Sequence, residues 1–319
     1  MKLGLFTAAL TKISLDELIP RVTALGIEAI ELSTGNYGAP AHIQLELIEQ
    51  PAKLKDLQKK LKDAGLFISA LGCGGNVLHP DTRIAEAHAT TMRRSILLAE
   101  ALEIPTVINF SGCPGDSDHS RYPNFVTVAW PPDYPEILRW QWEEKVLPFW
   151  RQESRFAAEH GIRIALEMHP GFVVYSPETL LRLRSETGPN IGCNFDPSHL
   201  FWQGIDPCLA VRKLENAIFH VHAKDTRIYE ANSRVNGVLD TKPYGDEINR
   251  SWIFRTVGFG HGLEFWTDFI STLSMIGYDG VISIEHEDSL MSLEDGMEKA
   301  AAFLRQILIR EKLREIWWA

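Results

Sequence analysis

Residues 162–195 read IRIALEMHPGFVVYSPETLLRLRSETGPNIGCNF. A short apolar run, 162–167, precedes a stretch with helical spacing from Pro177 to Glu186, and a second apolar run, 191–195, follows. Ser176 before Pro177 is typical of a helix start, and Gly188 is typical of a helix end. This order predicts two parallel strands joined by a helix.

The same alternation continues along the whole chain. The predicted strands are 2–6, 29–32, 67–71, 106–110, 162–167, 191–195, 218–222 and 281–285. The predicted helices are 15–25, 52–64, 84–102, 140–160, 177–186, 207–214, 263–276 and 293–315. Eight strands alternating with eight helices predict a single (β/α)8 barrel.

The chain of 319 residues is longer than the roughly 250 that are typical of such a barrel. Two insertions account for the excess, 111–139 after the fourth strand and 223–262 after the seventh. Both follow strands, so we expect long loops at the C-terminal mouth that act as lids or substrate walls, with plain surface loops or subunit contacts as the alternative. No change in composition indicates a second domain, and residues 1–319 are predicted to form one domain.

The composition excludes several classes of function. Lys plus Arg number 32 against 42 Asp plus Glu, and a net charge of −10 makes sequence-independent nucleic-acid binding an unfavourable main task. No apolar run approaches the roughly 18 residues that span a bilayer, which excludes membrane insertion. The four cysteines form no metal or disulfide pattern, which predicts a reduced, cytoplasmic setting.

Ionisable side chains end the last four strands of the predicted barrel. They are Glu167, Asp196, His222 and Glu285. A carboxylate after an apolar strand is costly to bury without a partner, and three converging carboxylates repel one another unless a cation joins them. Carboxylate oxygens with one imidazole suit Mn²⁺, and Mg²⁺, Co²⁺ or Zn²⁺ are alternatives. The sequence therefore predicts one divalent ion at the mouth, and His220, two residues before His222, is expected one layer deeper in the barrel.

Five short motifs add a resemblance to this pattern: EMHP (167–170), NFDPSHL (194–200), HVHAKD (220–225), VGFGHG (257–262) and SIEHED (283–288). The chain resembles the xylose isomerase-like TIM-barrel superfamily over nearly its whole length. That superfamily contains sugar isomerases, ketose 3-epimerases and endonuclease IV. The resemblance implies that the four residues above bind the metal, that Glu167 and Glu285 also act as acid and base, and that His199 holds a substrate oxygen.

Further residues near the mouth are predicted to bind substrate. His169 follows a strand end, Lys224 lies two residues after a predicted ligand, and Arg255 and His261 lie in the second insertion. A cationic side chain there would bind a carboxylate, phosphate or enolate oxygen. Trp202 follows Asp196 and is expected either to stack on a sugar or to pack within its own loop.

These features predict a metal-dependent isomerase or epimerase that moves a proton through an enediolate of a ketose or keto-sugar. Two alternatives stay open. The first is a metal-dependent lyase or dehydratase, or an epimerase, that acts on a 3-keto-glycoside, which the resemblance implies because relatives with enlarged mouths use such substrates and both insertions here are long. The second is a sugar-binding barrel without turnover. Endonuclease IV uses further histidines for a cluster of three metals, and the early strand ends offer only His79. The partner is therefore expected to be a small sugar, and the terminal Trp317-Trp318 pair is expected to pack on the barrel or to contact another subunit of a homo-oligomer.

Overall fold

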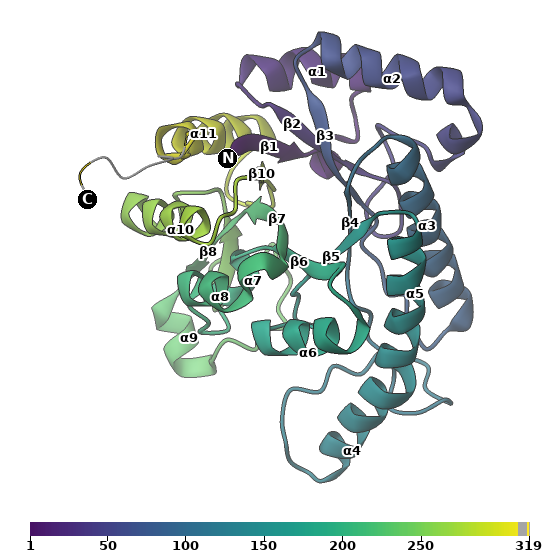
Figure 1. Cartoon of the computed structure of the whole chain (residues 1–319). Coiled ribbons are helices and arrows are strands. Elements are labelled where there is room, and N and C mark those ends of the chain that lie inside the picture. Colours follow the sequence, from purple (N-terminus) through teal and green to yellow (C-terminus); the bar gives the residue numbers. More distant parts are fainter. Residues whose placement is uncertain (312–317, 319) are drawn as a thin grey trace.

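The computed structural model describes residues 1–311 and 318. Eight parallel strands close into a barrel in the order β1-β10-β7-β6-β5-β4-β3-β2 (Figure 1). The closing pair joins β1 to β10, with Leu5 opposite Ile284. The barrel strands are β1 (Lys2–Phe6), β2 (Ala29–Ser33), β3 (Phe67–Gly72), β4 (Thr106–Asn109), β5 (Arg163–Glu167), β6 (Ile191–Phe195), β7 (Ile218–Ala223) and β10 (Val281–Ile284). The predicted (β/α)8 fold is confirmed.

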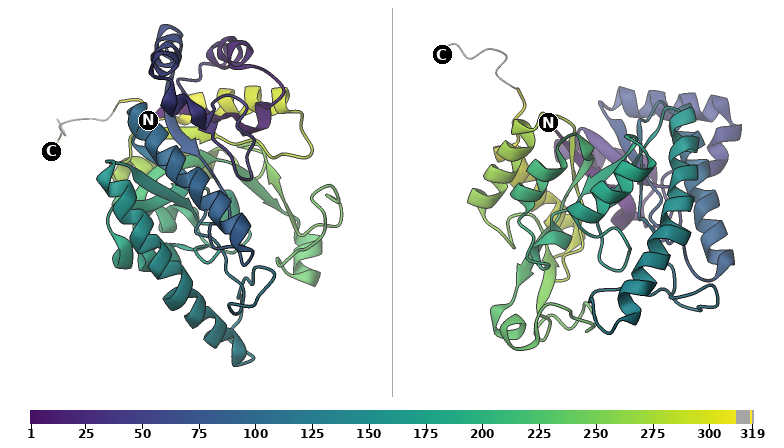
Figure 2. Two further views of the ribbon diagram at one scale, coloured as in Figure 1. Left: turned by 90° about the vertical axis from the view of Figure 1, so that its right-hand side faces the viewer. Right: turned by 60° about the horizontal axis from the view of Figure 1, so that its bottom comes forward.

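Helices surround the barrel on its outside, as the two views in Figure 2 show. The longer ones are α1 (Leu15–Ala24), α2 (Pro51–Asp63), α3 (Thr82–Ala101), α5 (Leu147–Glu159), α6 (Pro177–Thr187), α10 (Leu263–Met275) and α11 (Leu293–Ile307). The shorter ones are α4 (Asp133–Trp140), α7 (Ser198–Phe201), α8 (Pro207–Leu214) and α9 (Glu230–Asn236). Ser14 and Ser176 both form capping boxes, which explains why α1 and α6 begin where the sequence predicts.

Apolar side chains pack on both faces of the barrel strands. The larger core lies between the helices and the outer face of the barrel and contains the fully buried rings of Trp150 and Trp266. A small cluster of Ala70, Ile108 and Ala165 packs with Phe219. Ala165 lies two residues before Glu167 on the same side of β5, so this cluster fills the barrel interior below the mouth.

Long connections follow β4 and β7, and the second of them contains structure that the sequence did not predict. Strands β8 (Asp225–Ile228) and β9 (Trp252–Arg255) form an antiparallel pair, with α9 between them in sequence. In the first connection a helix begins at Asp133, before the predicted residue 140, and a π-helical turn, Gln141–Val146, joins α4 to α5. The side chain of Gln141 donates to the carbonyls of Gly115 and Asn124 and so holds the connection against this turn.

The C-terminal helix is shorter than the predicted range 293–315. It ends at Ile307, because Leu308 turns to an extended conformation and is buried. The N-terminal ammonium of Met1 then donates to the carbonyl of Ile309, which fixes this segment against β1. The rest of the predicted helix, 312–315, and Trp317 lie outside the described residues, while the side chain of Trp318 is exposed.

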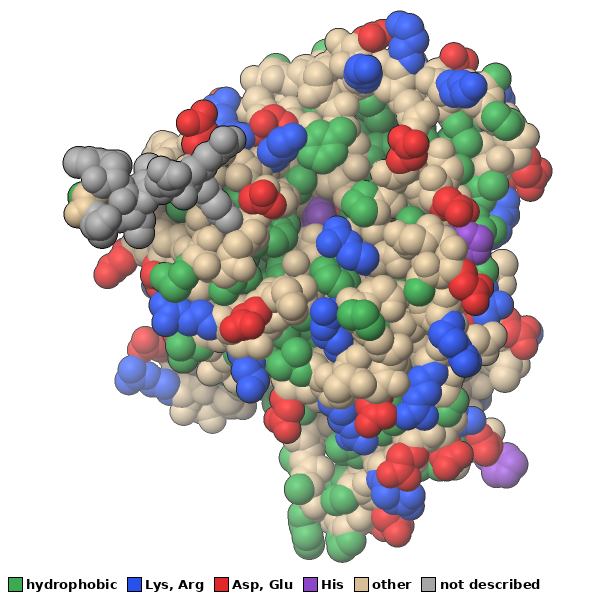
Figure 3. All heavy atoms as spheres, in the orientation of Figure 1, with side chains coloured by type: hydrophobic (Ala, Val, Ile, Leu, Met, Phe, Trp, Pro, Cys, Tyr) green, Lys and Arg blue, Asp and Glu red, His purple; other side chains and the backbone are tan. Residues whose placement is uncertain are grey.

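Charged side chains, which make up 23% of the sequence, are common on the surface of the protein (Figure 3). On the face in Figure 3, side chains of both charges are interspersed, and no large patch of one sign is visible. Among the described helices, none combines the length and the apolar character needed to cross a membrane.

Candidate metal centre

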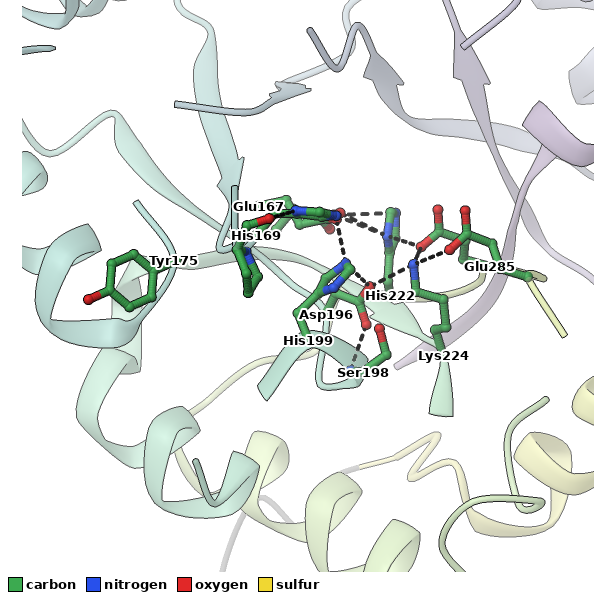
Figure 4. Close-up of polar contacts among 12 residues, drawn as sticks. Glu167, His169, Tyr175, Asp196, Ser198, His199, His222, Lys224 and Glu285 are labelled. Atoms are coloured by element: carbon green, nitrogen blue, oxygen red, sulfur yellow. Dashed lines mark hydrogen bonds and ion pairs between the residues drawn. The ribbon is translucent and has the colours of Figure 1, made fainter. Parts of the chain in front are cut away.

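Four side chains of the kinds that bind divalent metals converge at the C-terminal mouth of the barrel (Figure 4). Glu167 ends β5, Asp196 follows β6, His222 lies near the end of β7, and Glu285 follows β10. One ligand atom from each residue lies within 4.8 Å of the other three. The structure therefore brings together all four side chains that the strand ends predict.

The imidazole of His222 lies between the two glutamates. Its Nδ1 atom is 3.1 Å from Oε2 of Glu285 and 3.3 Å from Oε2 of Glu167. Figure 4 shows the two glutamates reaching this ring from opposite sides. All these side chains are buried apart from Glu285, whose side chain is 15% exposed.

Two of the carboxylate oxygens have no hydrogen-bond donor in suitable geometry among the described residues. They are Oδ2 of Asp196 and Oε2 of Glu285, and both are buried. The Nζ atom of Lys224 lies 3.0 Å from the Asp196 oxygen and 2.7 Å from the Glu285 oxygen. The ammonium group therefore compensates their charge without forming a well-oriented hydrogen bond to either. Buried carboxylate oxygens without donors are costly unless a metal binds them, and the donor set fits a divalent ion.

The electrostatics of the cluster keep its members charged. Burial raises the pKa of Asp196, but Lys224 and His199 outweigh it and hold this pKa well below its ordinary value. Burial also raises the pKa of Glu285, and Lys224 and His222 again lower it. Burial lowers the pKa of His222, whereas the carboxylates of Glu31 and Glu285 raise it well above the ordinary value. The site thus holds ionised carboxylates beside protonated side chains whose charge a metal would replace.

His169 and His199 lie beside the cluster, as predicted. The Nε2 atom of His199 is 3.1 Å from Oε1 of Glu167 and 3.2 Å from Oδ2 of Asp196. Burial lowers the pKa of His199, but Asp196 reverses this effect and raises the pKa to about 9. The rings of His169 and His199 lie 4.1 Å apart, and burial together with the charge of His199 lowers the pKa of His169 to about 3. One imidazole is therefore cationic and its neighbour neutral.

A second polar layer lies one step deeper in the barrel. His220 donates from Nδ1 to Oδ1 of Asn194, and Asn194 in turn donates from Nδ2 to Oε2 of Glu167. Oε2 of Glu31, in β2, lies 2.9 Å from Nε2 of His222 and accepts from the hydroxyl of Ser283. The prediction that His220 lies below His222 agrees with this placement, whereas Glu31 and Asn194 were not predicted.

The remaining predicted substrate residues contact groups outside the metal cluster. Trp202 is buried and stacks on Trp252 at 4.7 Å, so that this face of its ring packs within the loop rather than on a sugar. Arg255 is paired with Asp288, its Nε atom 3.0 Å from Oδ2. Phe254 was not predicted to lie near the site. Its ring lies 4.7 Å from Nζ of Lys224 and 5.4 Å from the ring of His199.

His261 belongs to a loop that is folded around one buried carboxylate. Oδ2 of Asp225 accepts the backbone N–H groups of Gly258, Gly260 and His261 and the indole N–H of Trp266. The Nδ1 atom of His261 also lies 2.8 Å from Oδ1 of Asp225, and its ring stacks on Phe201. The VGFGHG motif thus forms a turn around the aspartate of the HVHAKD motif.

A small cavity of about 160 Å³ reaches the cluster from outside. Its lining includes Phe6, Glu285 and Glu287. A larger cavity of about 500 Å³ lies at the opposite end of the barrel, where Phe67 and Arg163 begin their strands, and none of the predicted site residues lines it. In barrels of this kind the C-terminal ends of the strands carry the chemistry, and the ionisable cluster is found there.

Comparison with known proteins places the chain in a family. The family model of the xylose isomerase-like TIM barrel matches residues 19–307. The chain belongs to this family. The uncharacterized protein YfiH of Bacillus subtilis is 38% identical to this chain, over 97% of this chain and 99% of the length of YfiH. The inosose dehydratase of Geobacillus thermodenitrificans is 30% identical over 47% of this chain and 49% of its own.

Solved structures support the same fold. A D-tagatose 3-epimerase-like protein matches with a TM-score of 0.64 at 22% identity, over 96% of this chain and 97% of that one. The IolI protein, solved with a bound zinc atom, also matches with a TM-score of 0.64, at 19% identity, over 97% of this chain and 98% of that one. At these identities the similarity shows the xylose isomerase-like barrel and not a shared reaction.

Proposed function

We propose that the protein is a divalent-metal-dependent sugar isomerase or epimerase that acts on a ketose or keto-sugar by proton transfer through an enediolate. The observation that carries this proposal is the position of Glu167 and Glu285 on opposite sides of His222 at the barrel mouth (Figure 4). Two carboxylates that face one substrate from two sides can remove a proton on one side and return it on the other. The epimerase-like structural neighbour is consistent with this reaction class.

The residues that would hold the metal are Glu167, Asp196, His222 and Glu285. A divalent ion bound there supplies a Lewis acid that stabilises the negative charge developing on a carbonyl oxygen. Manganese is our first choice for this oxygen-rich set, with magnesium, cobalt or zinc as alternatives, and the zinc bound in IolI shows that a relative of this fold holds a metal.

The protein's own groups then account for the proton transfers. Hydrogen bonds from His199 and Asn194 fix the carboxylate of Glu167, one at each oxygen. The carboxylate of Glu285 is held less firmly than that of Glu167, because its Oε2 atom forms ion pairs with Lys224 and His222 but no well-oriented hydrogen bond. We assign the two glutamates as acid and base in turn, with their positions compensating for the basicity that metal coordination removes.

Cationic groups beside the glutamates would hold the substrate oxygens. His199 is positively charged and buried, and it touches both Glu167 and Asp196. Lys224 is buried on the other side of Asp196. Charge-assisted hydrogen bonds from these groups would orient the hydroxyls next to the reacting carbon, and neutral His169 would add a further contact.

A dehydratase is the second candidate, and the position of Lys224 favours it. After a carboxylate removes the α-proton, the C–O bond at the neighbouring carbon breaks, and the leaving hydroxide takes a proton from the ammonium to form water. The Nζ atom of Lys224 lies 2.7 Å from Oε2 of Glu285, so base and acid would be adjacent. The inosose dehydratases among the relatives agree with this second reaction, and both candidates share the first proton removal.

The test is hydrogen exchange in D₂O with the manganese-loaded protein. Ketohexoses, an inosose and a 3-keto-glycoside are offered in turn, and each product is followed by NMR and mass spectrometry. An epimerase or isomerase introduces deuterium at a C–H without losing water, whereas a dehydratase lowers the product mass by one water. Binding of a sugar without exchange would instead support a barrel that does not turn over.

Glu285→Gln is the informative variant, because it keeps the shape of the side chain and removes the base. We expect it to fold and to lose exchange by at least about a hundredfold. The matched control is Glu153→Gln, which alters a buried carboxylate on α5 that pairs with Arg93 away from the site. Normal exchange in Glu285→Gln would refute the role of this residue.

A further inference from the structure

A buried carboxylate from the opposite side of the barrel contacts the predicted metal-binding histidine. Glu31 lies in β2, and two strands, β1 and β10, separate it from His222 in β7. Its Oε2 atom is 2.9 Å from Nε2 of His222, and its side chain is only 1% exposed. Neither the sequence pattern nor the comparisons assign this residue a role.

The two ring nitrogens of His222 face different partners. Nε2 faces the carboxylate of Glu31, whereas Nδ1 faces Glu167 and Glu285, the two glutamates of the metal cluster. The amide nitrogen of Asn194 lies beside the ring edge, 3.2 Å from Nδ1 and 3.3 Å from Nε2, so Glu31 is the partner that distinguishes Nε2. A ring nitrogen that binds a metal carries no proton, so the proton of a neutral imidazole must lie on the other nitrogen. Here that nitrogen is Nε2, and the oxygen that can accept its hydrogen bond belongs to Glu31.

Glu31 is itself fixed from a second direction. The hydroxyl of Ser283, in β10, donates to the same Oε2 atom at 3.2 Å. Ser283 lies two residues before Glu285 on the same side of its strand. The carboxylate is therefore held between β7 and β10, the two strands that also supply one histidine and one glutamate of the cluster.

We propose that Glu31 is a positioning residue of the metal site: it accepts the Nε2–H of His222 and so directs Nδ1 of this histidine toward the metal. The inference rests on the proposed function only in that a metal binds at the mouth. A carboxylate behind a metal-binding histidine holds one tautomer and increases the basicity of the nitrogen that binds, and loss of such a partner costs tenfold to a hundredfold in metal affinity.

A second cation site is the competing explanation, because Glu31, His220 and His222 also lie within 4.8 Å of one another. The hydrogen bonds of His220 argue against a second cation site. Nδ1 of His220 is bonded to Asn194 at 3.0 Å, and Nε2 of His220 lies 3.2 Å from the hydroxyl of Ser69. The nitrogen of His220 that lies near Glu31 is Nδ1, at 3.9 Å, and it carries a proton because it donates to the amide oxygen of Asn194, so it cannot bind a metal there.

The experiment is calorimetric titration of the metal-free protein with Mn²⁺ alone, together with elemental analysis of the loaded protein. Glu31→Gln keeps an acceptor oxygen but removes the charge, and we expect it to weaken Mn²⁺ binding by about tenfold. Glu31→Ala removes the acceptor as well, and we expect a loss near a hundredfold. Wild type and both variants should bind one ion per chain. Glu153→Gln, which alters an equally buried carboxylate paired with Arg93, should bind Mn²⁺ as wild type does.

The outcomes separate the possible roles of Glu31. Wild-type Mn²⁺ affinity in folded Glu31→Gln and Glu31→Ala would overturn the proposal and leave Glu31 a purely structural residue. Two ions in wild type and one in Glu31→Ala would also overturn it, in favour of a second cation site. If Glu31→Ala does not fold, Glu31→Gln decides alone. Because no sugar takes part, weakened Mn²⁺ binding supports the positioning role even if the proposed reaction fails.

Discussion

The Nζ atom of Lys224 lies 2.7 Å from Oε2 of Glu285. The same ammonium is 3.0 Å from Asp196 and 3.0 Å from Glu287, and its side chain is 2% exposed. Burial lowers the pKa of Lys224, but the surrounding carboxylates outweigh it and raise this pKa well above its ordinary value. Lys224 thus supplies positive charge at the place where the proposed metal would supply more.

Lys224→Met tests this overlap of charge. Removal of one partner from a buried ionic cluster costs about 3 kcal/mol or more, so we expect the metal-free variant to be markedly less stable than wild type. Manganese should recover part of the loss, since the ion compensates the same carboxylates. The increase in melting temperature on addition of Mn²⁺, measured against EDTA, should therefore be larger in Lys224→Met than in wild type. Equal increases would show that ammonium and metal act independently.

The turn around Asp225 provides a second prediction, on stability. A methyl group at Gly260 would lie 2.4 Å from Oδ1 of Asp225 and from the carbonyl of Thr226, whereas one at Gly262 would meet nothing within 4 Å. We expect Gly260→Ala to lower the free energy of unfolding by about 2 kcal/mol and Gly262→Ala, at the N-cap of α10 where glycine is preferred to alanine, to lower it by less than about 1 kcal/mol. Denaturant unfolding of the two variants measures the difference. Equal stabilities would contradict the tight packing of this turn.

Asp288 gives a prediction on pH. Its Oδ2 atom accepts hydrogen bonds from Nε of Arg255 and from the backbone N–H of Thr256, at 3.0 and 2.8 Å. Burial raises the pKa of Asp288, but the bonds from Thr256 and Arg255 outweigh it and lower this pKa below the ordinary 3.8. A lowered pKa contributes stability that is complete above the ordinary value and is lost as the pH falls through the folded-state value.

Asp288→Asn should therefore be less stable than wild type near neutral pH, by about 1 to 3 kcal/mol. The difference should shrink when the pH falls below about 4, because wild type then loses the same contribution. Urea unfolding of both proteins at neutral pH and at about pH 3.5 measures it. A difference that stays constant over this range would show that the ionised form of Asp288 has no special role.

Much of this fold is predictable because its signals are local. The run Ile191–Phe195 and the helix Pro207–Leu214 have the predicted bounds in the structure. Each segment combines a clear apolar period with turn residues at its ends, and these determine where an element begins. The hairpin of β8 and β9 is different, because Asp225–Ile228 pairs with a strand more than twenty residues away across a polar stretch. No pattern within either segment indicates that the two strands pair.

The candidate site shows the same contrast between positions that local signals predict and contacts that depend on the tertiary fold. Glu167, Asp196, His222 and Glu285 all end strands of one barrel, and this topology brings them together without further information. Glu31 was missed although a usable signal existed: it is a carboxylate inside the apolar run Ala29–Ser33, and its burial requires a partner. What the sequence does not contain is the partner itself, because the contact with His222 depends on how the barrel closes. The burial of Trp202 against Trp252 likewise depends on the unpredicted hairpin.

The metal content of the purified protein is the first measurement to make, because every role proposed for the mouth of the barrel depends on a bound metal. Elemental mass spectrometry is applied to wild type and to Asp196→Ala, in which one of the two oxygens without a suitable donor is lost. We expect about one divalent ion per chain in wild type and a strong loss in the variant, with both proteins folded. Absence of metal from both proteins, even after incubation with manganese, would contradict this expectation, because the carboxylates at the mouth would then be compensated by Lys224 and the histidines alone.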